Sequence, residues 1–182
     1  NIVTSLLNLK KEISNSQEVK DALEDCRNRV FSMALVHQTI FNNNSIVELN
    51  FKAYIESLTT EIKNSLGSNK PVDIHLDTEL VMLDLSTAIP CGLILNELIT
   101  NSFKYASSDD KSLVIDIKMR QLNNTVELEV RDNGKGLPDN WKQNSYSLGM
   151  ELISSLCEQI DGTHQFKNDK GLVFNLSFKL KG

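Results

Sequence analysis

The sequence has few cysteines and lacks any long apolar run. Its three cysteines, Cys26, Cys91 and Cys157, are far apart, odd in number and each set in an apolar helical pattern. That spacing fits neither a disulfide framework nor a zinc cage, so we expect three small core residues in a reducing compartment. No apolar stretch approaches the roughly 20 residues that span a bilayer, and no signal peptide precedes the first periodic segment.

Basic charge is also scarce. Lysine and arginine together number 19, against 24 aspartates and glutamates, which gives a net charge of -5. A grip on nucleic-acid phosphates needs a basic face, so nucleic acid is excluded as a partner. The chain begins at Asn1, without methionine and inside a helical pattern. We therefore expect a cytoplasmic piece of a longer protein that makes no membrane contact itself, whereas other segments of the parent could reach a membrane.

The N-terminal part carries a heptad pattern. Its apolar positions are spaced four and three apart, as in two helices with a coiled-coil seam. The two series are Ile2, Leu6, Leu9, Ile13 and Val19, Leu23, Cys26, Val30, Met33, His37, Ile40. The polar turn Ser14-Asn15-Ser16 between them predicts an antiparallel hairpin whose seam is half covered on its own. We expect two copies to pair as a four-helix bundle; the alternative is a hairpin docked only on its own downstream domain.

The polar run Asn42-Asn43-Asn44-Ser45 predicts a boundary between a hairpin domain, 1–45, and a second domain, 46–182. The downstream patterns predict an α/β sandwich with a mixed sheet and helices on one face, so the whole chain is α+β. The predicted helices are Phe51 to Leu66, Thr87 to Ala106 and Gly149 to Ile160, and the predicted strands are Val72 to Asp77, Ser112 to Gln121, Thr125 to Arg131, Thr163 to Lys167 and Leu172 to Leu180.

A polar stripe lies on the predicted helix over 87–106. That helix is apolar on most of its circumference, so it must be largely buried. Glu97, Asn101 and Lys104 follow one another at spacings of four and three, which places them on one face. Groups of this kind need partners when buried. Two interpretations stay open: a stripe that faces a ligand, or a solvated face with incidental charges.

The segment Asp132-Asn133-Gly134-Lys135-Gly136-Leu137-Pro138 directly follows an alternating strand. Asn-Gly is typical of a hairpin turn. No strand follows at once, however, which favours glycines that let the backbone approach a flat ligand and a carboxylate that accepts from an exocyclic amine. Further on, Ser147-Leu148-Gly149-Met150 opens an amphipathic helix. A glycine at a helix start exposes N–H groups that suit a phosphate, although many helices begin this way.

Together these stretches resemble the histidine kinases of the ATPase group that also includes gyrase, the Hsp90 chaperones and the MutL repair proteins. Asn96 to Ala106 resembles their N box, Asp132 to Gly136 the G1 box and Ser147 to Met150 the G2 box. Upstream, Arg27 to His37 followed by Phe51 to Ile55 is similar to the subfamily whose dimerisation helix carries a His-His-Arg-x-Lys-Asn-Asn signature. The resemblance implies a Bergerat-type ATP-binding domain behind a partial dimerisation and histidine-phosphotransfer hairpin.

The resemblance also implies roles for single residues. Asp132 would bind the adenine amino group, Asn101 would ligate Mg²⁺ and Lys104 would contact phosphate. Glu97 takes the position of the acid that orients or deprotonates the acceptor. The remaining ATP contacts fall on Gly134, Gly136, Leu148 and Gly149.

The activity that the resemblance implies is transfer of the ATP γ-phosphate to a histidine, from which the receiver domain of a response regulator takes it. The acceptor is expected upstream of Asn1, because His37 lies in the seam and is followed by Gln38 instead of an acid. His75 and His164 receive no role. The alternatives are an ATPase or serine-kinase-like domain of the same fold, with a glutamate as general base, and a non-catalytic nucleotide-sensing dimerisation module.

Two departures from the family favour the nucleotide-sensing alternative. Leu172 stands where a threonine near the adenine is common, which removes one polar or water-mediated contact to the base. The segment from Asp139 to Tyr146 is short for an ATP lid.

Overall fold

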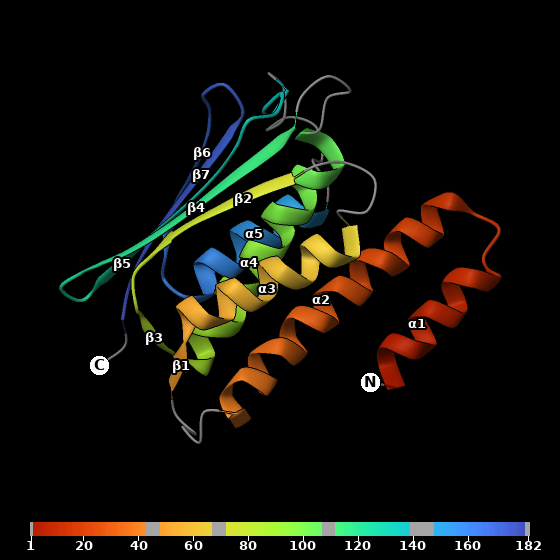
Figure 1. The fold of residues 1–182 in the computed structure, drawn as a ribbon, viewed down its shortest axis with the longest axis horizontal. Coiled ribbons are helices and arrows are strands. Elements are labelled where there is room, and N and C mark those ends of the chain that lie inside the picture. The colour runs from red at the N-terminus through yellow and green to blue at the C-terminus, as the bar shows by residue number, and fades with distance from the viewer. Residues whose placement is uncertain (1, 43–47, 67–71, 107–111, 139–147, 181–182) are drawn as a thin grey trace.

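The computed structural model describes residues 2–42, 48–66, 72–106, 112–138 and 148–180. Helices α1 (Ile2–Ile13) and α2 (Gln17–Asn42) form the predicted hairpin (Figure 1). The polar turn caps the second helix, because Ser16 Oγ accepts a hydrogen bond from the Val19 N–H at 3.4 Å. In the part of the chain that the structure describes, no helix combines the length and the apolar character that crossing a bilayer requires.

A five-stranded mixed sheet has the order β2-β4-β5-β7-β6. Strands β2 and β4 are parallel, and the other neighbouring pairs are antiparallel. The strands are β2 (Val72–Thr78), β4 (Leu113–Leu122), β5 (Thr125–Asp132), β6 (Thr163–Asn168) and β7 (Leu172–Lys179). All five lie where the sequence predicts them, with ends that shift by at most one residue. A separate two-stranded sheet pairs β1 (Glu48–Asn50) with β3 (Met82–Asp84) and was not predicted, because three-residue strands carry too little pattern.

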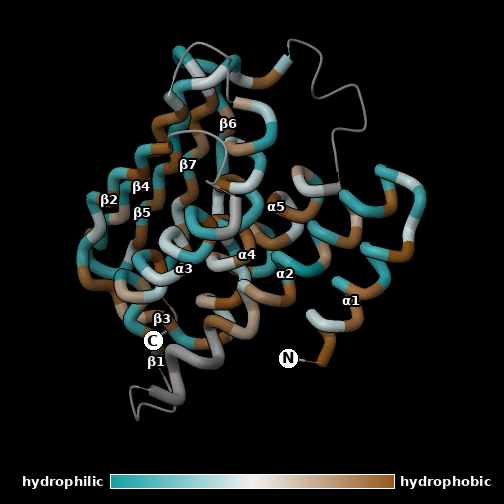
Figure 2. Tube along the Cα trace, turned by 45° about the vertical axis from the view of Figure 1, so that its right-hand side comes forward, coloured by the Kyte–Doolittle hydropathy of each residue, from teal (hydrophilic) through white to brown (hydrophobic). Residues whose placement is uncertain are grey.

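Helices α3 (Phe51–Leu66), α4 (Leu85–Asn101) and α5 (Leu148–Gln159) cover one face of the sheet (Figure 1). Hydrophilic and hydrophobic residues alternate along β2, β4 and β5 (Figure 2), so one face of each strand packs against the helices. The middle helix, α4, is buried at every residue from 90 to 100, as its apolar circumference predicts. The predicted mixed sheet with helices on one face is confirmed.

The hairpin docks on this sandwich through α2. Helix α2 packs along α4, and α1 contacts α2 further from the sheet (Figure 1). Ser32 on α2 is fully buried, and its Oγ lies 2.8 Å from Tyr54 Oη of α3 and 3.2 Å from the Gly92 carbonyl oxygen of α4. Burial raises the pKa of the Tyr54 hydroxyl, which therefore stays protonated. The seam of α1 remains uncovered: its exposed residues are Ile2, Leu6, Leu9 and Ile13.

Two sequence expectations end differently, and a third is not tested. The helix predicted to reach Ala106 is α-helical only to Asn101, and a π-helical turn, η2 (Ser102–Ala106), follows it. Cys26 is exposed rather than in the core, because α2 presents it to solvent; Cys91 and Cys157 are buried as expected. The predicted domain boundary between 45 and 46 lies outside the described residues.

Candidate functional site

Asp132 ends strand β5 with a carboxylate that is almost completely buried. Its Oδ1 accepts from the backbone N–H of Gly134 at 2.8 Å and of Leu172 at 3.1 Å. Its Oδ2 accepts from Ser102 Oγ at 3.0 Å. Since a carboxylate offers about four acceptor positions, one position on Oδ2 is left. The side chain is therefore fixed in orientation and still able to accept from a ligand.

Two asparagine side chains brace the loop that follows β5. Asn133 Oδ1 accepts from the Val114 N–H at 3.0 Å, and its Nδ2 donates to the Ser112 carbonyl oxygen at 2.9 Å. Asn168, at the end of β6, accepts from the Leu137 N–H at 2.8 Å and donates back to the Leu137 carbonyl oxygen at 2.6 Å. Among the described residues β5 pairs only with β4 and β7, so the Asn-Gly pair does not form a hairpin turn between neighbouring strands.

Three glycines allow backbone segments to meet around Asp132. A Cβ on Gly134 would lie 2.2 Å from the Cβ of Ala106, at the end of η2. Gly136 and Gly171 have φ angles of 71° and 137°, which glycine adopts without the strain that other residues meet. A Cβ on Gly171, in the β6–β7 turn, would lie 2.0 Å from the Asp132 carbonyl oxygen. Glycine is therefore needed at these contacts for geometric reasons.

The polar stripe runs from the end of α4 into η2. Glu97 is only 6% exposed, Asn101 is partly buried and Lys104 is exposed. Ser102, between the last two, contacts Asp132, so the structure brings the stripe and the glycine loop together. Glu97 is thus not an incidental surface charge, whereas Lys104 does lie on the surface. Single π-helical turns such as η2 are frequent at functional sites.

Two side chains of α2 reach the same stripe. Arg29 donates from Nε to Glu97 Oε1 at 2.6 Å and from Nη2 to Glu97 Oε2 at 3.0 Å. These hydrogen bonds raise the pKa of the Arg29 guanidinium, against the opposing effect of burial. Lys104 Nζ donates to a carboxylate oxygen of Asp25. Sequence reasoning missed Arg29 and Asp25, because 68 and 79 residues separate them from their partners.

Leu148 and Gly149 begin α5 as predicted, and α5 packs against α4. Gly149 is buried. The preceding residues 139–147, which include Ser147 and the segment predicted as a short lid, lie outside the described residues. A phosphate contact at this helix start stays a prediction.

The residues of the stripe fit a magnesium ion that arrives with a nucleotide. Within the described ranges, no three His, Cys, Asp or Glu side chains are grouped so that they could hold a metal. Asn101 is partly buried, and in the same ranges no hydrogen bond occupies its side-chain amide. Mg²⁺ commonly takes few protein ligands and completes its shell with substrate phosphates and water. One free amide oxygen beside a nucleotide site meets that requirement.

The described histidine side chains lie in other parts of the molecule. His75 Nδ1 lies 2.9 Å from Asp116 Oδ1, between strands β2 and β4, and His164 Nε2 lies 3.2 Å from Ser154 Oγ of α5. These contacts give both residues structural partners that the sequence alone did not show. The side chain of His37 lies outside the described residues.

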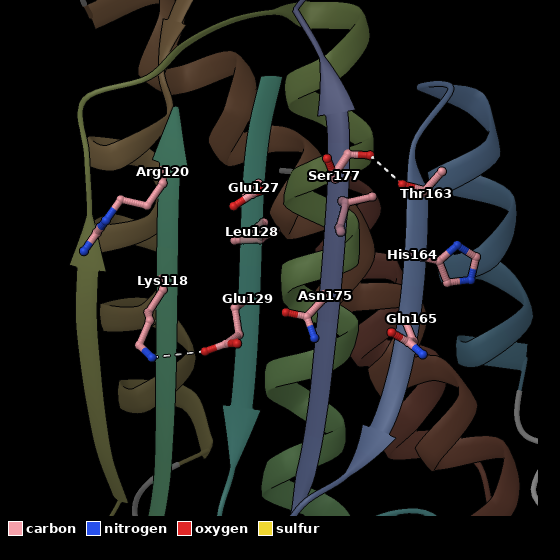
Figure 3. Close-up of a pocket in the computed structure, with 11 residues that line it drawn as sticks. Lys118, Arg120, Glu127, Leu128, Glu129, Thr163, His164, Gln165, Asn175 and Ser177 are labelled. Carbon is pink, nitrogen blue, oxygen red and sulfur yellow. Dashed lines mark hydrogen bonds and ion pairs between the residues drawn. The ribbon is translucent and has the colours of Figure 1, made fainter. Parts of the chain in front are cut away.

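A cavity of about 680 Å³ lies elsewhere, on the sheet face that points away from the helices (Figure 3). Its walls carry the Lys118–Glu129 ion pair, 3.1 Å long, and the polar side chains of Asn175 and Ser177. Neither Asp132 nor any residue of the stripe lines it. The predicted site residues therefore lie outside this cavity.

The fold and the site together define a nucleotide-binding α/β sandwich preceded by a helical hairpin. Residues 1–66 match the family described as "Histidine kinase", and residues 87–182 match the family described as "Histidine kinase-, DNA gyrase B-, and HSP90-like ATPase". The second match covers more than half of the chain. The chain therefore belongs to this ATPase family, and its N-terminal third matches the histidine kinase family.

Individual relatives agree with this assignment. The chain is 24% identical over 164 residues to the sensor histidine kinase PdtaS of Mycolicibacterium smegmatis and 26% identical over 165 residues to PdtaS of Mycobacterium tuberculosis, in each case over 88% of the chain. It spans about a third of the length of these curated relatives. The solved histidine kinase domain of the Erythrobacter litoralis EL346 blue-light activated kinase superposes with a TM-score of 0.77 at 17% identity, over 98% of this chain and 92% of that one. This last likeness shows a shared fold.

Proposed function

We propose that the full-length protein is an ATP-dependent protein-histidine kinase of a two-component system. This chain binds ATP and supplies the groups that transfer its γ-phosphoryl group to a histidine, and a response-regulator receiver domain takes the phosphoryl group from there. The buried Asp132 carboxylate carries the proposal, because three donors fix it and one acceptor position on Oδ2 is left over. The two family matches support it.

At the adenine end, Asp132 Oδ2 accepts a hydrogen bond from the exocyclic amino group of the base. A fixed carboxylate also discriminates between purines: guanine presents a carbonyl oxygen at the equivalent position, and two acceptors repel each other. The glycine loop and the β6–β7 turn hold the carboxylate in place from both sides.

At the phosphate end, the proposed contacts come from the stripe. Asn101 offers its amide oxygen to Mg²⁺, and the ion, when bound, neutralises charge on the phosphate oxygens. Lys104 offers an ammonium group to a phosphate oxygen, and Leu148 and Gly149 offer the start of α5. The chain's task here is to align the phosphates and to balance their charge.

The transfer step needs little covalent help from the chain. The neutral imidazole attacks the γ-phosphorus with its own lone pair, a P–N bond forms, and the bond from phosphorus to the β,γ-bridging oxygen breaks, which leaves ADP. The other ring nitrogen carries the N–H, and Glu97 accepts from it and thereby orients the ring. In this proposed role Glu97, which is 6% exposed, contacts the acceptor histidine and not the nucleotide.

We further propose that two copies pair through the hairpin and that this core acts in the cytoplasm, where ATP is available. The seam of the first helix supports the pairing, since its apolar side chains are exposed in the single chain. The residues are Ile2, Leu6, Leu9 and Ile13, with Val19 and Met33 on α2.

The substitution Asp132→Asn in the full-length protein tests the proposal. An amide would turn a donor toward either the backbone N–H groups or the adenine amine, so we expect ATP affinity to fall by about 10- to 100-fold. Calorimetric titration with Mg²⁺-ATP measures this, and labelling by radioactive ATP should fall with it. Asp116→Asn, an exposed carboxylate on β4, is the matched control and should change neither.

The same experiment separates the competing functions. Unchanged affinity in Asp132→Asn would refute the proposed nucleotide site. Tight binding by the wild type without any labelled histidine would favour the nucleotide-sensing module instead. Label recovered on His37 by mass spectrometry would show that the seam position is the acceptor.

A further inference from the structure

Helix α2 offers one charged side chain to each of the two proposed transfer residues. Arg29 binds Glu97, and Asp25, one helical turn earlier, binds Lys104. The order is reversed on α4 and η2, where Lys104 comes after Glu97, so the two helices run antiparallel at this contact. The charges are complementary in both pairs: the basic Arg29 faces the acidic Glu97, and the acidic Asp25 faces the basic Lys104.

The contact with Glu97 uses both carboxylate oxygens. Arg29 Nε lies 2.6 Å from Oε1 and Nη2 lies 3.0 Å from Oε2, which is the bidentate geometry that makes arginine–carboxylate pairs strong. The side chains are 19% and 8% exposed, so water competes weakly for either partner. A histidine ring that donates to Glu97 must share this carboxylate with the Arg29 guanidinium, which already contacts both of its oxygens.

The contact with Lys104 is more open. Its side chain and that of Asp25 are 35% and 38% exposed, and lysine has a flexible stem that changes partner readily. While its ammonium group donates to Asp25, the charge that a phosphate oxygen would attract is already balanced. Asp25 and a bound phosphate are therefore alternative partners of one group.

The two exchanges do not require the hairpin to undock. One turn beyond Arg29, Ser32 is fully buried and holds α2 against Tyr54 and Gly92 through neutral hydrogen bonds. That contact carries no charge that a phosphate or an imidazole would attract. Side-chain rotation at Asp25 and Arg29 would break neither of the Ser32 contacts.

We propose that Asp25 and Arg29 are positioning residues that restrain transfer: Asp25 competes with the ATP phosphates for Lys104, and Arg29 competes with the acceptor histidine for Glu97. The inference rests on the proposed function of these two partners. It adds that the two residues act on different steps: Asp25 restrains nucleotide binding, and Arg29 restrains the transfer step. The hairpin is thereby a part of the catalytic arrangement and not only a dimerisation element.

Two substitutions in the full-length protein test the division of labour. Asp25→Asn should lower the Kd and the KM for Mg²⁺-ATP by about two- to fivefold, as expected for a half-exposed ion pair, and should leave adenosine affinity unchanged. Arg29→Gln should raise the maximal labelling rate by roughly tenfold with unchanged ATP affinity, because a charged bidentate contact is lost. Arg29→Lys, which keeps the charge without the fork, should fall between Arg29→Gln and the wild type.

Glu24→Gln is the matched control. Glu24 lies beside Asp25 and is 18% exposed, and its described ion pairs, with Lys11 and Arg27, lie within the hairpin. Glu24→Gln should therefore leave KM and the labelling rate at wild-type values. Variants that shift KM and rate together, as a loosened hairpin would, overturn the proposal. So does a lower labelling rate in Arg29→Gln, since Arg29 would then support Glu97. A wild type that neither binds ATP nor becomes labelled refutes the proposed function itself, whereas a labelled wild type with indifferent variants refutes only the restraint.

Discussion

The two ends of the proposed nucleotide site are held by different kinds of bonds. At the adenine end, neutral donors of the sandwich itself hold Asp132: two backbone N–H groups and one hydroxyl. At the phosphate end, charged side chains of the hairpin hold Glu97 and Lys104. The first set of bonds lies inside one domain, and the second set joins two segments of the chain.

This difference indicates that the adenine end is preorganised, whereas the side chains at the phosphate end can change partners. Backbone donors are fixed by strand pairing and glycine turns, so Asp132 needs no rearrangement before it binds a base. Long charged side chains at partly exposed positions exchange partners through rotamer changes, and the exchange of Asp25 for a phosphate oxygen would keep Lys104 in an ion contact. In the proposed function, recognition of the base is therefore built into the sandwich, and the proposed control of transfer lies at its junction with the hairpin.

The largest expected effect comes from Gly171→Ala, which disturbs the backbone around Asp132 at the proposed adenine end. Gly171 has φ of 137° and its Cβ would lie 2.0 Å from the Asp132 carbonyl oxygen, so the β6–β7 turn must shift. We expect a loss of roughly 1–3 kcal/mol in the free energy of unfolding together with weaker ATP binding. Urea unfolding and calorimetric titration measure the two quantities.

Gly162→Ala provides the comparison for that substitution. Gly162 lies before β6, and its Cβ would meet the end of the Leu176 side chain at 2.8 Å and the Cys157 carbonyl oxygen at 3.2 Å, both looser contacts than the one at Gly171. It should cost less stability and leave ATP affinity unchanged. Equal losses of affinity in both variants would show that the adenine end is not specially prepared.

The sequence predicts the long elements because each buries one face against a single core. Periodicity places α3 at Phe51–Leu66 and all five strands of the main sheet to within one residue. The π-helical turn at Ser102–Ala106 was missed, since one extra residue per turn leaves no mark in the hydrophobic pattern. Strands β1 and β3 were missed because of their length.

The candidate site was predicted only in part, for a similar reason. Motif order identifies Asp132, but its donors come from chain segments that meet only in the fold. Leu172 illustrates this: its side chain departs from the family, yet its backbone N–H still donates to the carboxylate. Ser102 supplies a hydroxyl at the same group. The contacts from α2 were out of reach, because sequence patterns do not pair residues that are 68 and 79 positions apart.

A moderate effect is expected at the far end of α4, from Asp84→Ala. Asp84 caps this helix by accepting from the Thr87 N–H at 2.9 Å, and the loss of such a cap costs about 1 kcal/mol. Because the cap is remote from the stripe, ATP affinity should not change. Asp84→Asn, which retains a capping oxygen, should stay close to the wild type in stability at neutral pH.

The contribution of Asp84 should also depend on pH. Burial opposes ionisation, but hydrogen bonds from Ser86 and Thr87 lower the pKa of this carboxyl below its ordinary value of 3.8. A lowered folded-state pKa gives stability that is present above the ordinary value and is lost as the pH falls through the folded one. The difference between the wild type and Asp84→Ala in acid unfolding should therefore shrink in that window, and a constant difference would contradict it.

The smallest expected effect comes from Ser102→Ala. This substitution tests the comparison between the adenine end and the phosphate end directly, because Ser102 belongs to η2 and yet contacts Asp132. The Leu98 carbonyl oxygen keeps a bond from the Ser102 backbone N–H, and Asp132 keeps its two backbone donors on Oδ1. What is lost is one neutral bond to the carboxylate, and adenosine and ATP affinity should both fall by about two- to fivefold. Thr100→Val, which removes a buried hydroxyl bonded only within α4, should change neither. If ATP affinity fell while adenosine affinity did not, Ser102 would act on the phosphates, and the adenine end would not be held by the sandwich alone.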